Sequence, residues 1–459
     1  MQRIIAKYGL AAHLALAAAA PLFLFPFFGT LVVSKVVLWL ALYAAVWTLM
    51  EPSIRSGEHL HDARKRVIKS IVHDPLFWTL SAIALLAGLQ WFNDGIQMAY
   101  DAENQVWSLA SPFFPILPGS VSGQGDLAFA LSVMLMVILA ACRHALGKSA
   151  RMVFLFVASL LSGLAAVVVV FAASQGHAES IAAMSCSSPA RSYIGATFGV
   201  YLMASTVALV FGVERQWLRA VPAFLLAIGG SAVGLVAFAP AYVILVFLAA
   251  ELVVVGYAFL FSLFVLKGGS EFKFFCFFVL ALGFCVLLVQ MAVVHRIFNQ
   301  RLAAVMAQDL FPVGFEHTRA VLSDIAFRVW KEHLWIGTGL GSFPFDIRFY
   351  ATAADWRAIP PGTLVVPNGG WQILAERGIV GAVQLAVPFV FLMFAYVRRL
   401  IVELRNRHVP HPACVVAPLA ALAIAVISIV DCTLMRMDFM LALCAVFALS
   451  ANSFHKEKK

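Results

Sequence analysis

The stretch AYVILVFLAAELVVVGYAFLFSLFVL, residues 241–266, decides the fold class, because it is apolar almost throughout and contains one charged residue, Glu251. A helix of about 17 to 25 apolar residues crosses a hydrocarbon core of roughly 30 Å. The whole chain has 459 residues, of which 63% are hydrophobic and 12% are charged, a composition outside the range of soluble domains. The sequence therefore predicts an integral membrane protein.

Apolar runs of this kind recur along the chain, and since only a helix or a closed barrel satisfies its own backbone in lipid, we expect helices. About 12 transmembrane helices are predicted by length. Their ranges are residues 9–27, 32–50, 75–93, 126–142, 152–174, 195–213, 221–238, 241–266, 274–295, 379–397, 412–431 and 438–453. The predicted fold is all-α, with residues 1–459 forming a single polytopic membrane domain.

The distribution of basic residues predicts the orientation. With the N-terminus inside, the cytoplasmic segments hold most of the 32 Lys and Arg residues, whereas the short external loops hold Lys35, Arg191 and Arg436. The positive-inside rule then places both termini in the cytoplasm. The first run also resembles a signal peptide, but keeping it as a membrane helix lets every later loop obey the rule. This topology explains the basic excess without a nucleic-acid partner.

A long polar segment, residues 296–378, is predicted as a periplasmic loop between the ninth and tenth helices. Within it, residues 319–334 have apolar side chains at helical spacing, with Asp324 and Arg328 paired on another face, which predicts an amphipathic helix. The GTGLG sequence that follows lacks the spacing of a nucleotide loop and indicates a flexible turn. The arginines of this loop either belong to a solvated domain or receive an anionic substrate.

The order of an Arg-led helix, the turn GTGLGSF and the sequence NGGWQILAERGIVG leading into a helix resembles the O-antigen ligase and polymerase family, over residues 319–385. The resemblance implies a bacterial inner-membrane protein of envelope polysaccharide biosynthesis, for lipopolysaccharide or exopolysaccharide. It would act at the periplasmic face on a polyprenyl-pyrophosphate-linked glycan and transfer it to an acceptor glycan or lipid as a metal-independent glycosyltransferase, without a cofactor. Other envelope-assembly proteins are implied partners, and nucleic acid is not.

The resemblance also implies site residues. A guanidinium stabilises the charge of a pyrophosphate leaving group, and a histidine accepts the proton of the acceptor hydroxyl. Pro367 stands where the family places that histidine, so other acids and bases become candidates. The candidate catalytic residues are His317 and Glu376, with His333 and Glu316 as alternatives. The candidate pyrophosphate or glycan ligands are Arg319, Arg348, Asn368 and Arg377, of which Arg377 is equally an interface anchor.

Three further points stay open from sequence. Glu251 either lines a polar cavity, with Gln290 as a partner, or has a structural role, since a charge in a membrane helix is costly. Cys186 and Cys432 map near the outer face, where they either form a disulfide or are two small apolar residues. A catalytically silent glycan-lipid-binding or scaffold protein is the alternative function. A transporter or flippase is disfavoured, because no internal repeat is evident.

Overall fold

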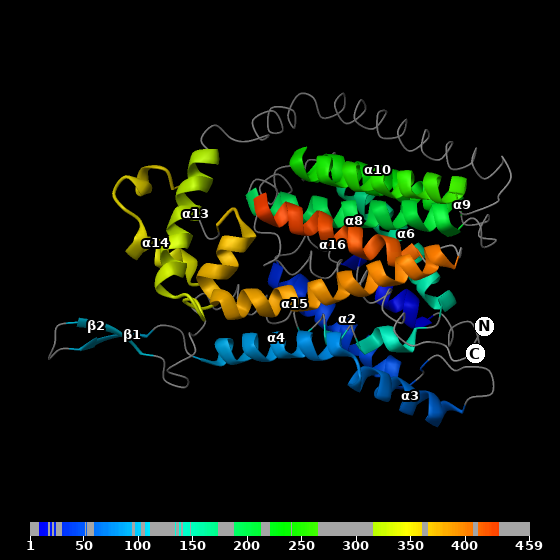
Figure 1. The fold of residues 1–459 in the computed structure, drawn as a ribbon, viewed down its shortest axis with the longest axis horizontal. Coiled ribbons are helices and arrows are strands. Elements are labelled where there is room, and N and C mark those ends of the chain that lie inside the picture. Colours follow the sequence, from blue (N-terminus) through cyan, green and yellow to red (C-terminus); the bar gives the residue numbers. More distant parts are fainter. Residues whose placement is uncertain are drawn as a thin grey trace.

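A computed structural model of the chain describes residues 9–16, 19–20, 23, 30–50, 52, 59–93, 97–101, 106–110, 134, 137–138, 141–146, 148–172, 188–212, 221–239, 241–264, 315–359, 366–406 and 412–430. The described part is mainly helical (Figure 1). Its α-helices are α2 Thr30–Met50, α3 Leu60–Val72, α4 Pro75–Phe92, α6 Lys148–Ala172, α8 Ser188–Gly212, α9 Val221–Phe238, α10 Ala241–Phe264, α13 Phe315–Glu332, α14 Phe343–Tyr350, α15 Gly369–Arg405 and α16 Pro412–Val430. Two 3-10 turns, η1 Arg143–Ala145 and η5 Asp355–Arg357, are also described.

Eight predicted spans coincide with described helices, which confirms that these runs are helical. They are residues 32–50 (α2), 75–93 (α4), 152–174 (α6), 195–213 (α8), 221–238 (α9), 241–266 (α10), 379–397 (α15) and 412–431 (α16). Residues 274–295 and 438–453 lie outside the described residues, as do most of residues 126–142. Part of the first span is described, and residues 9–16 are helical.

The described part is predominantly α-helical, as predicted, with one short β-hairpin in addition. Strands β1 Gln97–Asp101 and β2 Val106–Ala110 pair antiparallel, with Gln97 opposite Ala110 and Asp101 opposite Val106. They form a hairpin that follows α4, between the predicted spans 75–93 and 126–142. Strands this short contain too few residues for the alternation of polar and apolar side chains to stand out.

The long helices form a bundle in which α8 packs against α6, α9, α10 and α16, while α15 packs against α16 and α4. Small residues bring α6 and α9 together: a Cβ added to Gly230 would lie 2.5 Å from the Cα of Gly163. Beside this contact the hydroxyls of Ser162 and Ser231 are 2.6 Å apart and buried. Close backbone approach through small residues is a common way to pack helices in membranes.

The outer surface of the bundle carries large apolar side chains. Those more than half exposed include Trp39, Leu85, Leu245, Leu252, Val390, Phe394 and Ile429. Judged by length and apolar composition, no single helix among the described residues suffices to cross a membrane, whereas one bent pair, Leu60–Val72 with Phe77–Gln90, meets the criterion with a bend of 65°.

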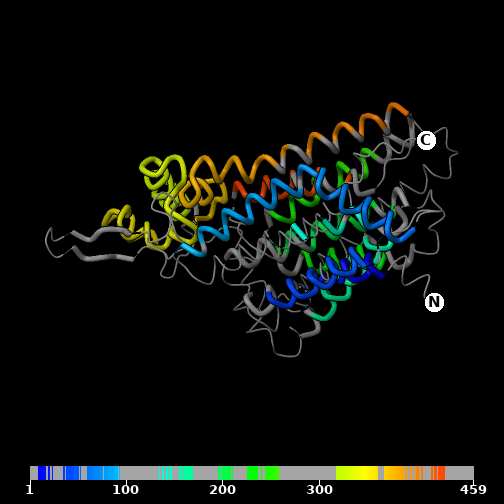
Figure 2. Tube along the Cα trace, turned by 90° about the horizontal axis from the view of Figure 1, so that it is seen from below, coloured from blue at the N-terminus to red at the C-terminus, as the bar shows by residue number. Residues whose placement is uncertain are grey.

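The two ends of the bundle differ. Figures 1 and 2 show α13, α14 and the beginning of α15 together at one end, while α3 lies at the opposite end. At the α3 end, Asp74 is buried between α3 and α4, and its Oδ2 accepts a hydrogen bond of 2.9 Å from His144 Nε2 of η1. We call residues 315–359 together with 366–380 the outer unit. Its own small apolar core consists of Leu322, Ile325, Ala326, Val329, Phe343, Ile347, Val366 and Ala375.

Candidate functional site at the break in α15

Helix α15 is interrupted at Gly378, which has φ 61° and ψ −166°. Such an interruption removes helical hydrogen bonds and leaves backbone groups on both sides that need other partners. The segment before α14 supplies them through four backbone hydrogen bonds. They run from Thr338 N to Ala375 O (3.0 Å), Gly339 N to Glu376 O (2.9 Å), Ile379 N to Leu334 O (3.0 Å) and Val380 N to Trp335 O (3.0 Å). We call this set of four bonds the clasp.

Two glycines allow the backbones to cross at the clasp. A Cβ added to Gly378 would lie 2.4 Å from the carbonyl carbon and oxygen of Trp335, and one added to Gly337 would lie 2.4 Å from Arg377 N. Gly337 also has a φ of 73°, which side chains other than glycine rarely adopt. The turn predicted at GTGLG is present after α13, and the backbone N–H groups of Thr338 and Gly339 within it are bonded to the broken helix.

Asp346 joins the clasp to α14. Its Oδ2 accepts hydrogen bonds of 2.8 Å from both Thr338 Oγ1 and Ser342 Oγ, and the residue is only 6% exposed. Burial raises the pKa of Asp346, although the two hydroxyls and the nearby His333 oppose that rise. Sequence reasoning missed this residue, for which the available signal was one acid in the apolar helix FPFDIRFY.

The two predicted site residues next to the break are both buried. Glu376 is 1% exposed, and its Oε1 accepts a hydrogen bond from Gln372 Nε2. Arg377 is 2% exposed, and burial lowers the pKa of its guanidinium to about 10, with the charge of Glu376 opposing. This burial does not fit the interpretation of Arg377 as an interface anchor. The protein instead encloses a cation and an acid at the point where α15 is interrupted.

Asn368, a predicted pyrophosphate or glycan ligand, is the N-cap of α15. Its Oδ1 accepts hydrogen bonds from Gly370 N at 3.0 Å and Trp371 N at 3.2 Å, as expected of a capping side chain. Gly369 and Gly370 are thus the first helical residues. The helix begins ten residues before the predicted start of the tenth span, inside the predicted loop 296–378.

Arg319 lies where α13 meets the end of α16. Its Nη2 donates a hydrogen bond of 2.9 Å to the carbonyl of Ile429, one of the last carbonyls of α16, which lack helical partners. His317 is exposed two residues earlier on α13, and the side chain of Glu316 is not among the described side chains. The amphipathic helix predicted at residues 319–334 is confirmed as α13, which begins four residues earlier.

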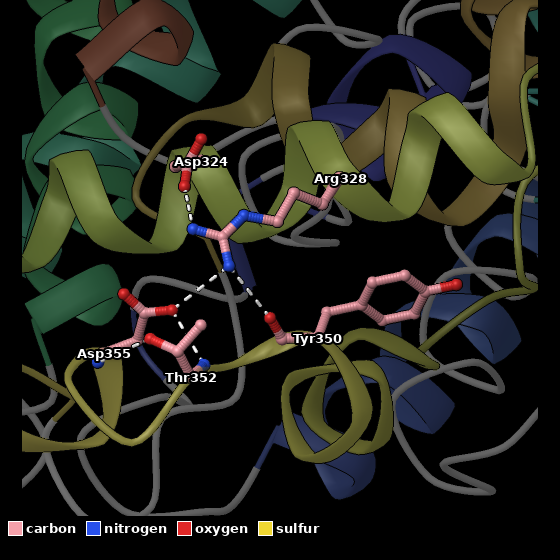
Figure 3. Close-up of polar contacts among 5 residues, drawn as sticks. All are labelled: Asp324, Arg328, Tyr350, Thr352 and Asp355. Atoms are coloured by element: carbon pink, nitrogen blue, oxygen red, sulfur yellow. Dashed lines mark hydrogen bonds and ion pairs between the residues drawn. The ribbon is translucent and has the colours of Figure 1, made fainter.

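Arg328 closes one flank of α13 against the segment after α14 (Figure 3). It forms the predicted ion pair with Asp324, and its Nη1 donates to Tyr350 O at 3.1 Å and to Asp355 Oδ2 at 3.2 Å. The pKa of Asp355 is lowered, first by a hydrogen bond from the Thr352 backbone N–H and then by the Arg328 charge. Because these contacts stay within the outer unit, we assign Arg328 a structural role.

The remaining predicted residues lie apart from the break. Arg348 is exposed on α14, with its guanidinium carbon 5.7 Å from the centre of the Phe345 ring. Glu251 lies in α10, where its carboxylate shares a hydrogen bond with Thr206 of α8 while Oε1 is buried with no partner in the described part of the chain. Gln290, Cys186 and Cys432 lie outside the described residues. Within the described ranges, no group of three His, Cys, Asp or Glu side chains is arranged to hold a metal ion.

Comparisons with protein-family models and with curated protein sequences find no match to this chain.

Proposed function

We propose that the chain is a bilayer-spanning protein of the O-antigen ligase and polymerase type. It binds a polyprenyl-pyrophosphate-linked glycan at the periplasmic face of the bacterial inner membrane. The observation that carries the proposal is that the residues bearing the resemblance, from Arg319 into α15, form one packed unit. A motif whose parts meet in space is stronger support than one whose parts merely follow each other in sequence.

Two features support the placement in a membrane. The bundle exposes many large apolar side chains on its outer faces, and extensive apolar surface of this kind marks contact with lipid or with another protein. The outer unit lies at one end of the bundle and α3, which carries Arg64, Lys65, Arg66 and Lys69, lies at the other. That separation agrees with a cytoplasmic α3 under the positive-inside rule.

In this proposal Arg319 is the pyrophosphate ligand. One of its nitrogens bonds to Ile429, but a guanidinium has five N–H donors in a planar fork, so the same side chain can also bind phosphate oxygens. His317 accepts the proton of the acceptor hydroxyl. The acceptor oxygen bonds to the anomeric carbon of the glycan, and the polyprenyl pyrophosphate leaves with the electron pair of the broken bond.

The test is glycan transfer in a strain that lacks the chromosomal copy and carries Arg319→Gln. Gln keeps a donor for the Ile429 carbonyl but removes the charge, so we expect transfer to fall at least about 100-fold while membrane insertion is unchanged. Arg357→Ala, an exposed arginine of η5, is the matched control. A wild-type glycan profile in the Arg319 variant would refute the assignment.

A catalytically silent glycan-lipid-binding protein is the second candidate. Pro367 can neither donate nor accept a proton, and Glu376 is buried and already hydrogen-bonded to Gln372. The family's histidine is therefore absent at position 367, and Glu376 is less suited to act as the base in its place. Purified protein that binds the lipid-linked glycan but transfers none to any acceptor would favour this function, whereas transfer that depends on His317 would exclude it.

A further inference from the structure

Three aromatic rings meet between α13 and the first turn of α15. Ring centroids are 5.4 Å apart for Phe327 and Trp371, 5.8 Å for Phe327 and Trp330, and 6.0 Å for Trp330 and Trp371. Phe327 is 40% exposed, and both tryptophans are half-buried. The cluster therefore borders the surface of the outer unit, and its Trp371 packs against the buried core that contains Leu322 and Val329.

The two cluster residues on α13, Phe327 and Trp330, share a helical face with Arg319. Phe327 and Trp330 follow Arg319 by eight and eleven positions, so all three lie within a sector of about 80° around α13. At 1.5 Å per residue, Phe327 is about 12 Å and Trp330 about 16 Å along the axis from Arg319. The Arg328 side of α13 is occupied by contacts to Tyr350 and Asp355 (Figure 3). The face of α13 that carries Arg319, Phe327 and Trp330 is therefore not the face that carries Arg328.

The cluster also contains a polar group that its own surroundings do not satisfy. Trp330 Nε1 is buried and has no hydrogen-bond partner among the described residues. A buried N–H without an acceptor costs free energy, and a ligand whose binding brings an acceptor to Trp330 Nε1 would recover it. Surfaces that combine exposed aromatic rings with such a donor fit a ligand that has both an apolar face and hydroxyl groups.

We propose that Phe327, Trp330 and Trp371 form a saccharide platform that binds the sugar rings nearest the pyrophosphate held by Arg319. A sugar ring presents C–H groups of slight positive charge on its face, which complement the negative face of an aromatic ring, and hydroxyls at its rim. The inference rests on the proposed function. If Arg319 binds the pyrophosphate, the sugar rings attached to that pyrophosphate extend from Arg319 toward the aromatic rings.

The experiment measures binding to purified full-length protein in lipid nanodiscs. The probes are undecaprenyl pyrophosphate carrying an N-acetylglucosamine disaccharide, undecaprenyl pyrophosphate without sugar, and soluble chitotriose. We expect Phe327→Ala to weaken binding of the glycan lipid and of chitotriose about three- to tenfold, with binding of the sugar-free lipid unchanged. Trp330→Phe, which keeps a ring and removes the N–H, should weaken the same two probes. Phe349→Ala, a 69% exposed phenylalanine of α14, is the matched control.

The outcomes separate the platform from the proposed function. Equal wild-type affinity for the two lipids, or equal loss of both in Phe327→Ala, overturns the platform while the pyrophosphate site stands. If wild-type protein binds neither lipid but binds chitotriose in a Phe327-dependent way, the platform stands and the proposed function falls. If it binds none of the three probes, both are overturned.

Discussion

The clasp predicts that Gly378→Ala disrupts the outer unit. With φ 61° and ψ −166°, Gly378 occupies a backbone region that is nearly exclusive to glycine, and another residue there costs about 1 to 3 kcal/mol. The added Cβ would also lie 2.4 Å from backbone atoms of Trp335, which no side-chain rotation relieves. In the variant, the clasp can form only with a strained backbone at residue 378 and a steric clash with Trp335. We therefore expect the four hydrogen bonds of the clasp to break.

The loss of the four hydrogen bonds of the clasp sets the expected loss of stability. Four backbone hydrogen bonds at a net 0.5 to 1.5 kcal/mol each give about 2 to 6 kcal/mol. Hydrogen–deuterium exchange followed by mass spectrometry should show faster exchange in peptides covering residues 334–341 and 375–382. The thermal unfolding midpoint should fall in the same variant.

Gly256→Ala is the control for the substitution itself. Gly256 lies within α10, and a Cβ added there would meet nothing within 4 Å, so the change should stabilise the helix by about 0.5 to 1 kcal/mol. Wild-type exchange in both clasp peptides of Gly378→Ala, together with an unchanged midpoint, would refute the reasoning about the clasp.

Two further predictions concern the outer unit. Asn368→Ala removes the cap of α15 and should destabilise the protein by about 1 kcal/mol in thermal unfolding, whereas Asn368→Asp, which keeps an acceptor oxygen, should not. Asp355 has a lowered pKa in the folded state, so it contributes stability above the unfolded pKa of about 3.9 that is lost as pH falls through the folded value. Asp355→Asn should therefore flatten the acidic end of the pH dependence of the unfolding midpoint relative to wild type, and identical curves would exclude this contribution.

Sequence periodicity was sufficient for the helices, because the signal is local. The run at residues 221–238 coincides with α9, and apolar spacing located α13 to within a few residues. The pattern failed for α3, because no helix was predicted in the charged sequence LHDARKRVIKSIV, although Ala63 and Val67 are buried on one face. A search for long apolar runs alone does not detect an amphipathic helix that lies between two such runs.

The site was only partly predictable. Arg319, Glu376 and Arg377 were named from their place in the motif, yet the burial of the last two depends on the clasp. The clasp is made by backbone atoms of segments far apart in the chain, and backbone pairing of this kind leaves no pattern of side chains to recognise. Asp346 was missed for the same reason. Its hydrogen-bond partners become neighbours only when the segment 334–341 is fixed against α15.

The crossing of Gly337 and Gly378 has a consequence for identifying relatives of this chain. Each glycine leaves room for the backbone on which the other lies, so a side chain at either position is excluded by the opposite segment. The two positions therefore form one constraint on sequence divergence, although more than thirty described residues separate them. A search pattern that requires both glycines and leaves the position of Pro367 unrestricted would select chains that can form the same backbone crossing.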